Sequence, residues 1–452
     1  METTDPPASL LCREVRDRNG RVYRVGESAG ELTGRGRIWM TVLPWLGMTG
    51  VACAGYAFLA AQATLGGARP WGGGVLWPAG LWAAALAGAA RWSGRRRENG
   101  PLSARAAVTA GAFATLLGCL ALALTPGVPV VRLGSALVGG AGAGLVHATC
   151  LTLPGKWWPE RRGGPTAFVA SGLAFGAVPY LPGLAGWPAA DAGQRTVLAA
   201  AGAGACLAVA AAARLLRDPP KNWWPPHTDP LRAPAARGGH ESNLPAVRHY
   251  TAEAAVRAPA LWLLGLCLLG AAGTTALGLR GLAHDGSGPE AGGGLAWAVV
   301  AGGAAAAGAG ALSDRLGRRR TLAATCLLLG AAQFGAAAAG RPDGVPLLVC
   351  CATATGLAGV AVLGLVTALA ADHFGENHHA SVYGLLAGAW LLPAAVVGTG
   401  TGAVGRDPHG ALLLAGCTGL ACAVPALFLK APGRPSARRI VPNPHPLGEE
   451  MA

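Results

Sequence analysis

Long apolar runs dominate this chain of 452 residues and set the strongest limit on its fold. A helix of about 20 apolar residues crosses a bilayer core that is roughly 30 Å thick. Inside hydrocarbon every backbone N–H and C=O must be bonded within its own segment, so each run is expected to be helical. We therefore predict an all-α integral membrane protein with twelve transmembrane helices. The predicted spans cover residues 38–60, 73–90, 106–124, 129–151, 164–184, 194–214, 258–278, 293–312, 321–340, 345–370, 382–404 and 411–429.

The distribution of Lys and Arg predicts the orientation of these spans. With the N-terminus in the cytoplasm, the cytoplasmic segments hold 30 of the 36 Lys and Arg residues, and the outer loops hold five. Cytoplasmic loops of membrane proteins carry such an excess. An incorrect number of spans would scramble this alternation, so the distribution favours twelve helices with both termini in the cytoplasm. The net charge of +14 is thereby explained by topology, and nucleic acid is not an expected partner.

The longest interior hydrophilic segment, residues 215–257, is rich in Pro and Arg and divides the spans into two groups of six. We expect a flexible cytoplasmic linker without a fold of its own. A weak repeat relates the two groups, because residues 158–160 precede the fifth span as residues 374–376 precede the eleventh. The predicted organisation is a cytoplasmic tail at 1–37, two six-helix bundles at 38–214 and 258–429, the linker between them, and a cytoplasmic tail at 430–452.

Residues 310–320 are the densest charge cluster between two spans. One acid, four arginines and a turn glycine separate two membrane-length apolar runs. Such charges cannot lie in hydrocarbon, so we expect a tight loop at a membrane face. The spacing Gly-x-x-x-Asp-Arg-x-Gly-Arg-Arg resembles the loop motif of the major facilitator superfamily of secondary transporters. The resemblance implies two six-helix bundles with a solute site near the midplane between them.

Two further observations refine this resemblance. In the first-half loop, residues 90–96, Arg91 stands where the motif has its acid, so that copy is interpreted as degraded. Several segments resemble the oxalate/formate antiporter branch and its monocarboxylate relatives, namely residues 156–163, 222–226, 257–264 and 383–386.

The expected solute follows from the charges inside the spans. Oxalate carriers of this branch are expected to hold their dianion with cationic side chains in second-half helices, yet the eighth and eleventh spans contain no Lys or Arg. We therefore expect a monocarboxylate, or else a neutral solute. No Asp or Glu lies in the middle of a span, so proton symport is not favoured, and uniport or exchange stays open.

Asp314 is the central residue of the expected gate. Its carboxylate can accept from backbone N–H groups at the start of a neighbouring helix, where the helix dipole favours negative charge. It can also pair with Arg161 or Arg162 across the seam between the halves. The alternative is that Asp314 only caps its loop and the arginines only set topology. The candidate gating and motif residues are Gly310, Asp314, Arg315, Gly317, Arg318, Arg319, Glu160, Arg161 and Arg162.

Candidate solute-binding residues lie within the spans. His147 is the clearest ionisable side chain inside a span, and such groups are candidates for function. Tyr56, Tyr180 and Trp390 lie in spans that line the cavity in the resembled superfamily, and they can hydrogen-bond or cover a small ligand. The alternative for each is ordinary contact between helices. Asp372 and His373 sit at a helix end and are expected to face water.

The other classes of protein have little support in the sequence. A membrane enzyme needs a nucleophile, a metal-ligand set or paired carboxylates at a membrane face, and no such motif is found. No catalytic residue, cofactor or metal is predicted. We expect a multi-pass protein of the cell membrane that acts as a monomer on a small-molecule solute. The alternatives are a transport-inactive sensor or scaffold on a carrier fold, and an exporter of a neutral or drug-like solute.

Overall fold

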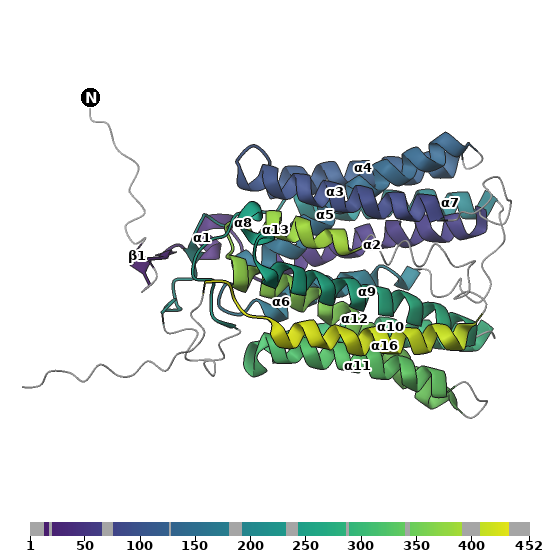
Figure 1. Cartoon of the computed structure of the whole chain (residues 1–452). Helices are drawn as coiled ribbons and strands as arrows, with labels where there is room; N and C mark the ends of the chain where they lie inside the picture. The colour runs from purple at the N-terminus through teal and green to yellow at the C-terminus, as the bar shows by residue number, and fades with distance from the viewer. Residues whose placement is uncertain are drawn as a thin grey trace, which may run out of the picture.

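The protein is known from a computed structural model that describes residues 13–17, 20–65, 76–125, 128–179, 192–231, 243–285, 289–339, 344–390 and 407–433. Its main body is a bundle of long helices that run alongside one another (Figure 1). The helices of the first half are α2 (Trp39–Leu65), α3 (Leu76–Glu98), α4 (Ala104–Leu124), α5 (Pro129–Trp157), α6 (Gly163–Phe175) and α7 (Ala192–Ala213). Those of the second half are α9 (Pro259–Asp285), α10 (Pro289–Leu316), α11 (Arg318–Ala338), α12 (Val345–Phe374), α13 (His379–Leu386), which continues as η5 (Ala387–Trp390), and α16 (Pro408–Phe428).

Each predicted span coincides with one of these helices. Eight of the described helices are long and apolar enough to cross a membrane. The other four are α3, α6, α7 and α13. The last turn of α3 carries three arginines, and the described part of α6 has 13 residues. The predicted fifth and eleventh spans continue into residues outside the described part of the chain. The all-α fold with twelve helices is therefore confirmed.

The outer surface of the bundle is apolar, as a lipid-facing surface must be. Large hydrophobic side chains are well exposed there, among them Leu124, Val130 and Leu207. A soluble monomer rarely exposes so much contiguous apolar surface. The bilayer is therefore the natural environment of this bundle.

The two halves meet along two seams. Within the first half, α5 packs against α3 and α4, and α2 packs against α6 and α7; within the second, α10 and α11 pack against α12, and α16 packs against α9 and α11. Between the halves, α6 packs on α10 and α12, and α3 packs on α13. Any movement of one half relative to the other would change the contacts at these seams. The domain boundaries stay predictions.

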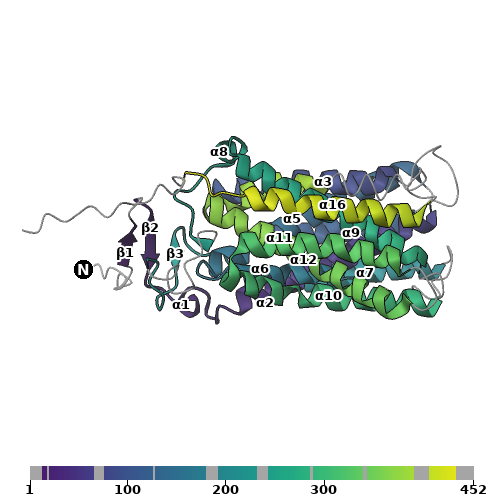
Figure 2. The same cartoon turned by 60° about the horizontal axis from the view of Figure 1, so that its bottom comes forward.

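A small three-stranded sheet lies beside one end of the bundle, which we call the tail-side end (Figure 2). Strands β1 (Arg13–Arg16) and β2 (Val22–Val25) form an antiparallel hairpin, and β2 pairs in parallel with β3 (Trp223–Trp224) of the linker. The short helices α1 (Ala29–Thr33) and α8 (Ala252–Val256) lie near this end too (Figure 1).

The expectation of a linker without fold is wrong for its described residues. Trp223 and Trp224 are buried, and the ring of Trp157 lies 5.0 Å from that of Trp223. Burying two indole rings stabilises the folded arrangement of this segment. The linker was predicted to be flexible from its content of Pro and Arg, although its two adjacent tryptophans indicated a buried segment.

Candidate functional site

Helices α6 and α10 approach each other very closely at the tail-side end. A Cβ atom added to Gly310 would lie 2.4 Å from the carbonyl oxygen of Gly163, and the reverse substitution would place a Cβ 2.4 Å from the Gly310 oxygen. Only glycine permits this contact between the two backbones. The motif glycine Gly310 therefore sets the distance between the halves.

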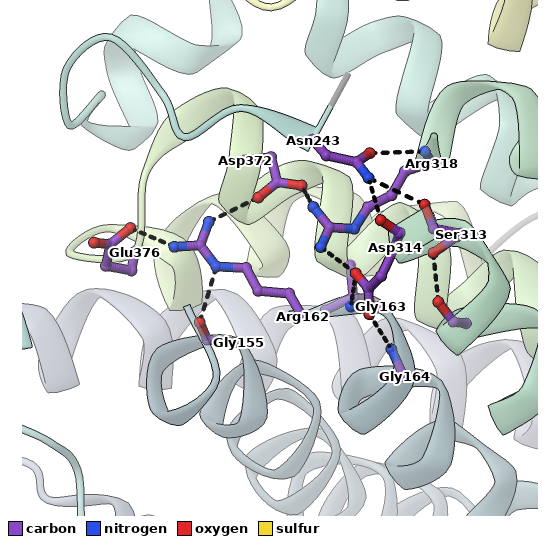
Figure 3. Close-up of polar contacts among 12 residues, drawn as sticks. Gly155, Arg162, Gly163, Gly164, Asn243, Ser313, Asp314, Arg318, Asp372 and Glu376 are labelled. Carbon is purple, nitrogen blue, oxygen red and sulfur yellow. Dashed lines mark hydrogen bonds and ion pairs between the residues drawn. The ribbon is translucent and has the colours of Figure 1, made fainter. Parts of the chain in front are cut away.

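This close approach lets Asp314 cap a helix of the opposite half. The N-cap residue of α6, Arg162, makes no side-chain capping bond. Instead, Gly163 N donates to Asp314 Oδ1 at 3.1 Å and Gly164 N donates to Oδ2 at 3.2 Å (Figure 3). A carboxylate is well placed there, because the first N–H groups of a helix are unpaired and carry the positive end of its dipole. The predicted contact between Asp314 and a helix start is confirmed.

A sharp turn at Gly317 separates α10 from α11. Its φ of 95° lies in the left-handed region, which favours glycine. The side chain of Asn243 in the linker hydrogen-bonds to both helices at this turn. At the end of α10, its Nδ2 donates to the carbonyls of Ser313 and Asp314, each at 3.1 Å. At the start of α11, its Oδ1 accepts from Arg318 N at 2.9 Å (Figure 3). The linker thus fixes the motif loop, which sequence reasoning did not foresee.

Arg162 carries the second connection between the halves. Its guanidinium donates to Gly155 O at 3.1 Å, to Asp372 Oδ1 at 2.9 Å and to Glu376 Oε2 at 2.8 Å (Figure 3). Its side chain is fully buried. Two predictions were wrong here: Arg162 does not pair with Asp314, and Asp372 does not face water. Asp372 is buried because the guanidinium groups of Arg162 and Arg318 enclose it.

Arg318 links these contacts into one cluster. It pairs with Asp314, four residues earlier in the chain, at 2.5 Å, and with Asp372. Arg21 of the N-terminal tail adds a third guanidinium by pairing with Glu376. We call the following residues the charge cluster: Arg21, Arg162, Arg318, Asp314, Asp372 and Glu376. Its three cations and three anions balance, which a buried ionic network requires.

The electrostatics keep Glu376 ionised. Burial alone would raise the pKa of its carboxyl, but the charges of Arg21 and Arg162 outweigh burial and hold this pKa well below its usual range. Glu376 is therefore ionised at neutral pH. Separating its members would leave buried charges unpaired, so the cluster favours the arrangement in which the halves touch.

The second seam carries a matching acid that sequence reasoning missed. The N-cap residue of α13, His378, makes no side-chain capping bond. Glu98, the last residue of α3, supplies the cap: Ser381 N donates to its Oε1 at 2.8 Å, and the hydroxyl of Ser381 donates to Oε2. His378 Nδ1 lies 3.4 Å from Oε2. An acid of each half thus caps a helix of the other half.

The interpretation of the first-half loop as degraded is wrong, because it aligned Arg91 with the acid of the motif, whereas Glu98 takes the part of that acid. Helix α3 continues past Gly94 to Glu98, seven residues after Arg91. Seven residues are about two helical turns, so Glu98 lies on the same face as Arg91. A Cβ on Gly94 would lie 2.4 Å from Ala380 O, just as one on Gly310 meets Gly163 O. The spacing Gly94-x-x-x-Glu98 repeats Gly310-x-x-x-Asp314, and that repeat was the available signal.

The other motif residues lie around the cluster. Glu160 is buried and pairs with Arg37 at 2.5 Å. Arg161 is 54% exposed and lies over the ring of Trp158, 4.5 Å from its centroid. Arg319 donates to Leu429 O at the end of α16 at 3.4 Å.

Arg315 is exposed at the end of α10. Because they sit outside the ion pairs between the halves, Arg161, Arg315 and Arg319 suit topology and local capping better than gating.

Only part of the predicted solute-binding set can be placed. Tyr56 lies on α2 and is 38% exposed. His147 is buried on α5, and its ring lies 6.0 Å from that of Tyr383 on α13. Tyr180 and the side chain of Trp390 lie outside the described residues. The structure thus brings His147 to the seam between α5 and α13, opposite an aromatic residue of the other half. No group of three or more His, Cys, Asp or Glu that could hold a metal occurs among the described residues.

The fold and its seams define a membrane transport protein rather than an enzyme. The sequence model of the Major Facilitator Superfamily matches residues 99–397 and also residues 261–449. The chain belongs to this superfamily. No curated protein matches it in sequence.

Solved structures show the same fold. The superfamily transporter FucP in its outward conformation is 16% identical, with a TM-score of 0.60 over 88% of this chain and 100% of that one. The proton:xylose symporter XylE is 14% identical, with a TM-score of 0.61 over 87% and 96%. The human organic anion transporter MFSD10 is 14% identical, with a TM-score of 0.61 over 88% and 100%.

Proposed function

We propose that this transporter moves a small organic anion, a monocarboxylate, by alternating access, with the tail-side end as one of its two gates. The observation that carries the proposal is the reciprocal capping at the two seams. Asp314 caps α6 and Glu98 caps α13, each from the opposite half. Polar contacts of this kind can be exchanged for water when the halves separate, whereas a continuous apolar interface would resist opening.

The proposed orientation places the tail-side end in the cytoplasm of the cell. The excess of Lys and Arg in the segments at this end supports it. The charge cluster then closes the cytoplasmic side, and release of its ion pairs opens it. We further propose that a single chain forms the complete pathway in the cell membrane.

The proposed solute class rests on the charges of the spans. His147, facing Tyr383 across a seam, is a suitable hydrogen-bond donor for one carboxylate. The resemblance of residues 156–163 to the oxalate/formate antiporter branch supports an anion, and the lack of Lys and Arg in the eighth and eleventh spans argues for a single charge. Exchange is the proposed coupling, because no carboxylate lies in the middle of a predicted span.

A neutral solute is the second candidate. It is favoured by the same scarcity of charged side chains, and the names of two structural relatives describe symporters of the sugars fucose and xylose. An inactive sensor on this fold is the third outcome that the experiment below distinguishes.

Counterflow in proteoliposomes tests the proposal. Purified protein is reconstituted and loaded in turn with monocarboxylates, dicarboxylates and neutral solutes, and protein-free liposomes serve as the control. Saturable exchange of a monocarboxylate, weakened by His147→Gln, is expected. Saturable flux of sugars alone would replace the anion proposal with the neutral solute. No saturable flux of any solute would support the sensor.

A further inference from the structure

The N-terminal tail reaches into the gate that closes the tail-side end. Arg21 directly precedes strand β2, and its side chain is almost fully buried. Its Nη1 donates to Ala246 O of the linker at 2.9 Å, and its Nη2 pairs with Glu376 in the second half. A tail residue therefore completes an ion cluster whose other members belong to the two halves of the bundle.

The same tail is attached to the first half and to the linker. Strand β2 pairs with β3, and Tyr23 packs edge-on against Trp224 with ring centroids 5.4 Å apart. Trp223 in turn contacts Trp157 at the end of α5, and its Nε1 donates to Glu27 O at 2.9 Å. The tail is thus held on the first half while Arg21 holds the second.

The charges show what Arg21 contributes. Without it, the charge cluster would have two guanidinium groups, on Arg162 and Arg318, against three carboxylates. A surplus carboxylate in a buried site is costly and draws in water. With Arg21 the count is three against three, and Glu376 accepts from two guanidinium groups. The closed arrangement therefore depends on the tail for its charge balance.

We propose that strands β1 and β2 form a strap that holds the tail-side gate closed, with Arg21 as the residue that fastens it. The strap sets the proportion of molecules that are open at this end. This inference rests on the proposed gate, because it states how that gate is regulated. A change that detaches the hairpin from β3 would release Arg21 and favour opening.

Hydrogen–deuterium exchange of the full-length protein in nanodiscs tests the strap without requiring a known solute. Arg21→Gln keeps a polar side chain of similar length and removes the charge. We expect the amides of residues 162–166 and 376–382 to exchange roughly tenfold faster, which corresponds to the loss of one charge-assisted hydrogen bond. Arg21→Lys, which keeps the charge, should restore most of the protection.

The matched control is Arg24→Gln in the same hairpin. Arg24 pairs with Glu14 at 3.5 Å on the surface, where both side chains are about half exposed, so its loss should leave exchange at the gate unchanged. A second variant, Tyr23→Ser, loosens the hairpin from Trp224 with Arg21 intact and should shift exchange in the same direction. It provides the test if the Arg21→Gln protein does not fold.

The outcomes separate the strap from the proposed function. Faster exchange confined to residues 13–25, or equal exchange in Arg21→Gln and Arg24→Gln, would overturn the strap. If counterflow finds no transported solute but the gate amides respond as expected, the strap stands and the proposed transport fails.

Discussion

At the scale of single residues, the halves are joined by acids that complete helices they do not belong to. Helices α6 and α13 both begin without a capping side chain of their own. Asp314 and Glu98 supply the missing acceptors from across the seams. A helix start offers several unpaired N–H groups, so one carboxylate in this position gains hydrogen bonds and a favourable interaction with the dipole.

Asp314→Asn should impair transport. The amide keeps the shape of the side chain but can present only one acceptor oxygen to Gly163 N and Gly164 N, and it leaves Arg318 without one of its two carboxylates. The loss of charged hydrogen bonds costs about 1.5–3 kcal/mol in the closed state, enough to change the opening equilibrium about tenfold or more. Counterflow of the best solute should fall accordingly at equal expression. Wild-type rates would mean that the cap which Asp314 places on α6 does not control transport.

Glu98→Gln should loosen the second seam. The neutral side chain loses the interaction with the dipole of α13, so we expect a few-fold faster amide exchange in residues 379–386. The control is Glu253→Gln, because Glu253 pairs with Arg95 on the surface with both side chains more than half exposed. Equal exchange in the two variants would show that the capping by Glu98 is without consequence.

At the scale of elements, the crossing of α6 and α10 depends on glycine. The backbones touch where Gly310 meets Gly163, and no side chain can be accommodated between them. The same relation holds between Gly94 of α3 and the start of α13. Both acids reach their targets because these contacts bring the helices so close.

Gly310→Ala should therefore destabilise the protein. The added Cβ would lie 2.4 Å from Gly163 O and force the helices apart, and overpacking of this kind typically costs about 1–3 kcal/mol. Thermal unfolding in detergent should show a lower Tm. Gly308→Ala is the control on the same helix, since a Cβ there meets no atom within 4 Å. Equal Tm values for both variants would contradict the role of the close approach.

At the scale of the whole molecule, the tail-side end combines the N-terminal tail, the linker and both halves. His249 of the linker packs against Gly375 beside the charge cluster. The pKa of His249 is lowered from 6.5 to about 4, mainly by burial; Glu376 opposes this shift and Arg21 adds to it. The folded protein therefore holds His249 neutral at a pH at which the unfolded chain protonates it.

Stability should consequently fall as the pH drops from about 6.5 toward 4. In this window the unfolded chain binds a proton at His249 that the folded protein does not bind. The free energy of unfolding therefore falls by up to about 1.4 kcal/mol for each pH unit. Above pH 6.5 the residue has no effect. The Tm of the wild type should fall more between pH 7.5 and 5 than that of His249→Gln. Parallel curves for the two proteins would contradict the prediction.

The sequence predicted the twelve helices because a membrane span needs only a local apolar run. It also predicted that Asp314 accepts from the start of a neighbouring helix, because the motif singled out this acid, although its partners in α6 lie 151 and 150 residues away. It could not predict that Asp372 is buried, because its partners Arg162 and Arg318 lie 210 and 54 residues away. Arg21 was hidden for the same reason, with its partner Glu376 lying 355 residues away. Glu98 was missed because the first-half loop was read seven residues out of register.

We propose that the tail-side end is a gate held closed by acids that act across the seams. Pulsed electron–electron double resonance, which measures the distance between two spin labels, tests this directly. The labels are placed at two exposed tail-side positions, Trp92 on α3 and Leu316 on α10, after the accessible native cysteines have been replaced. We expect one short distance between the labels in the wild type. In a protein that carries both Asp314→Asn and Glu98→Gln, a second, longer distance should dominate. The same single distance in both proteins would contradict it.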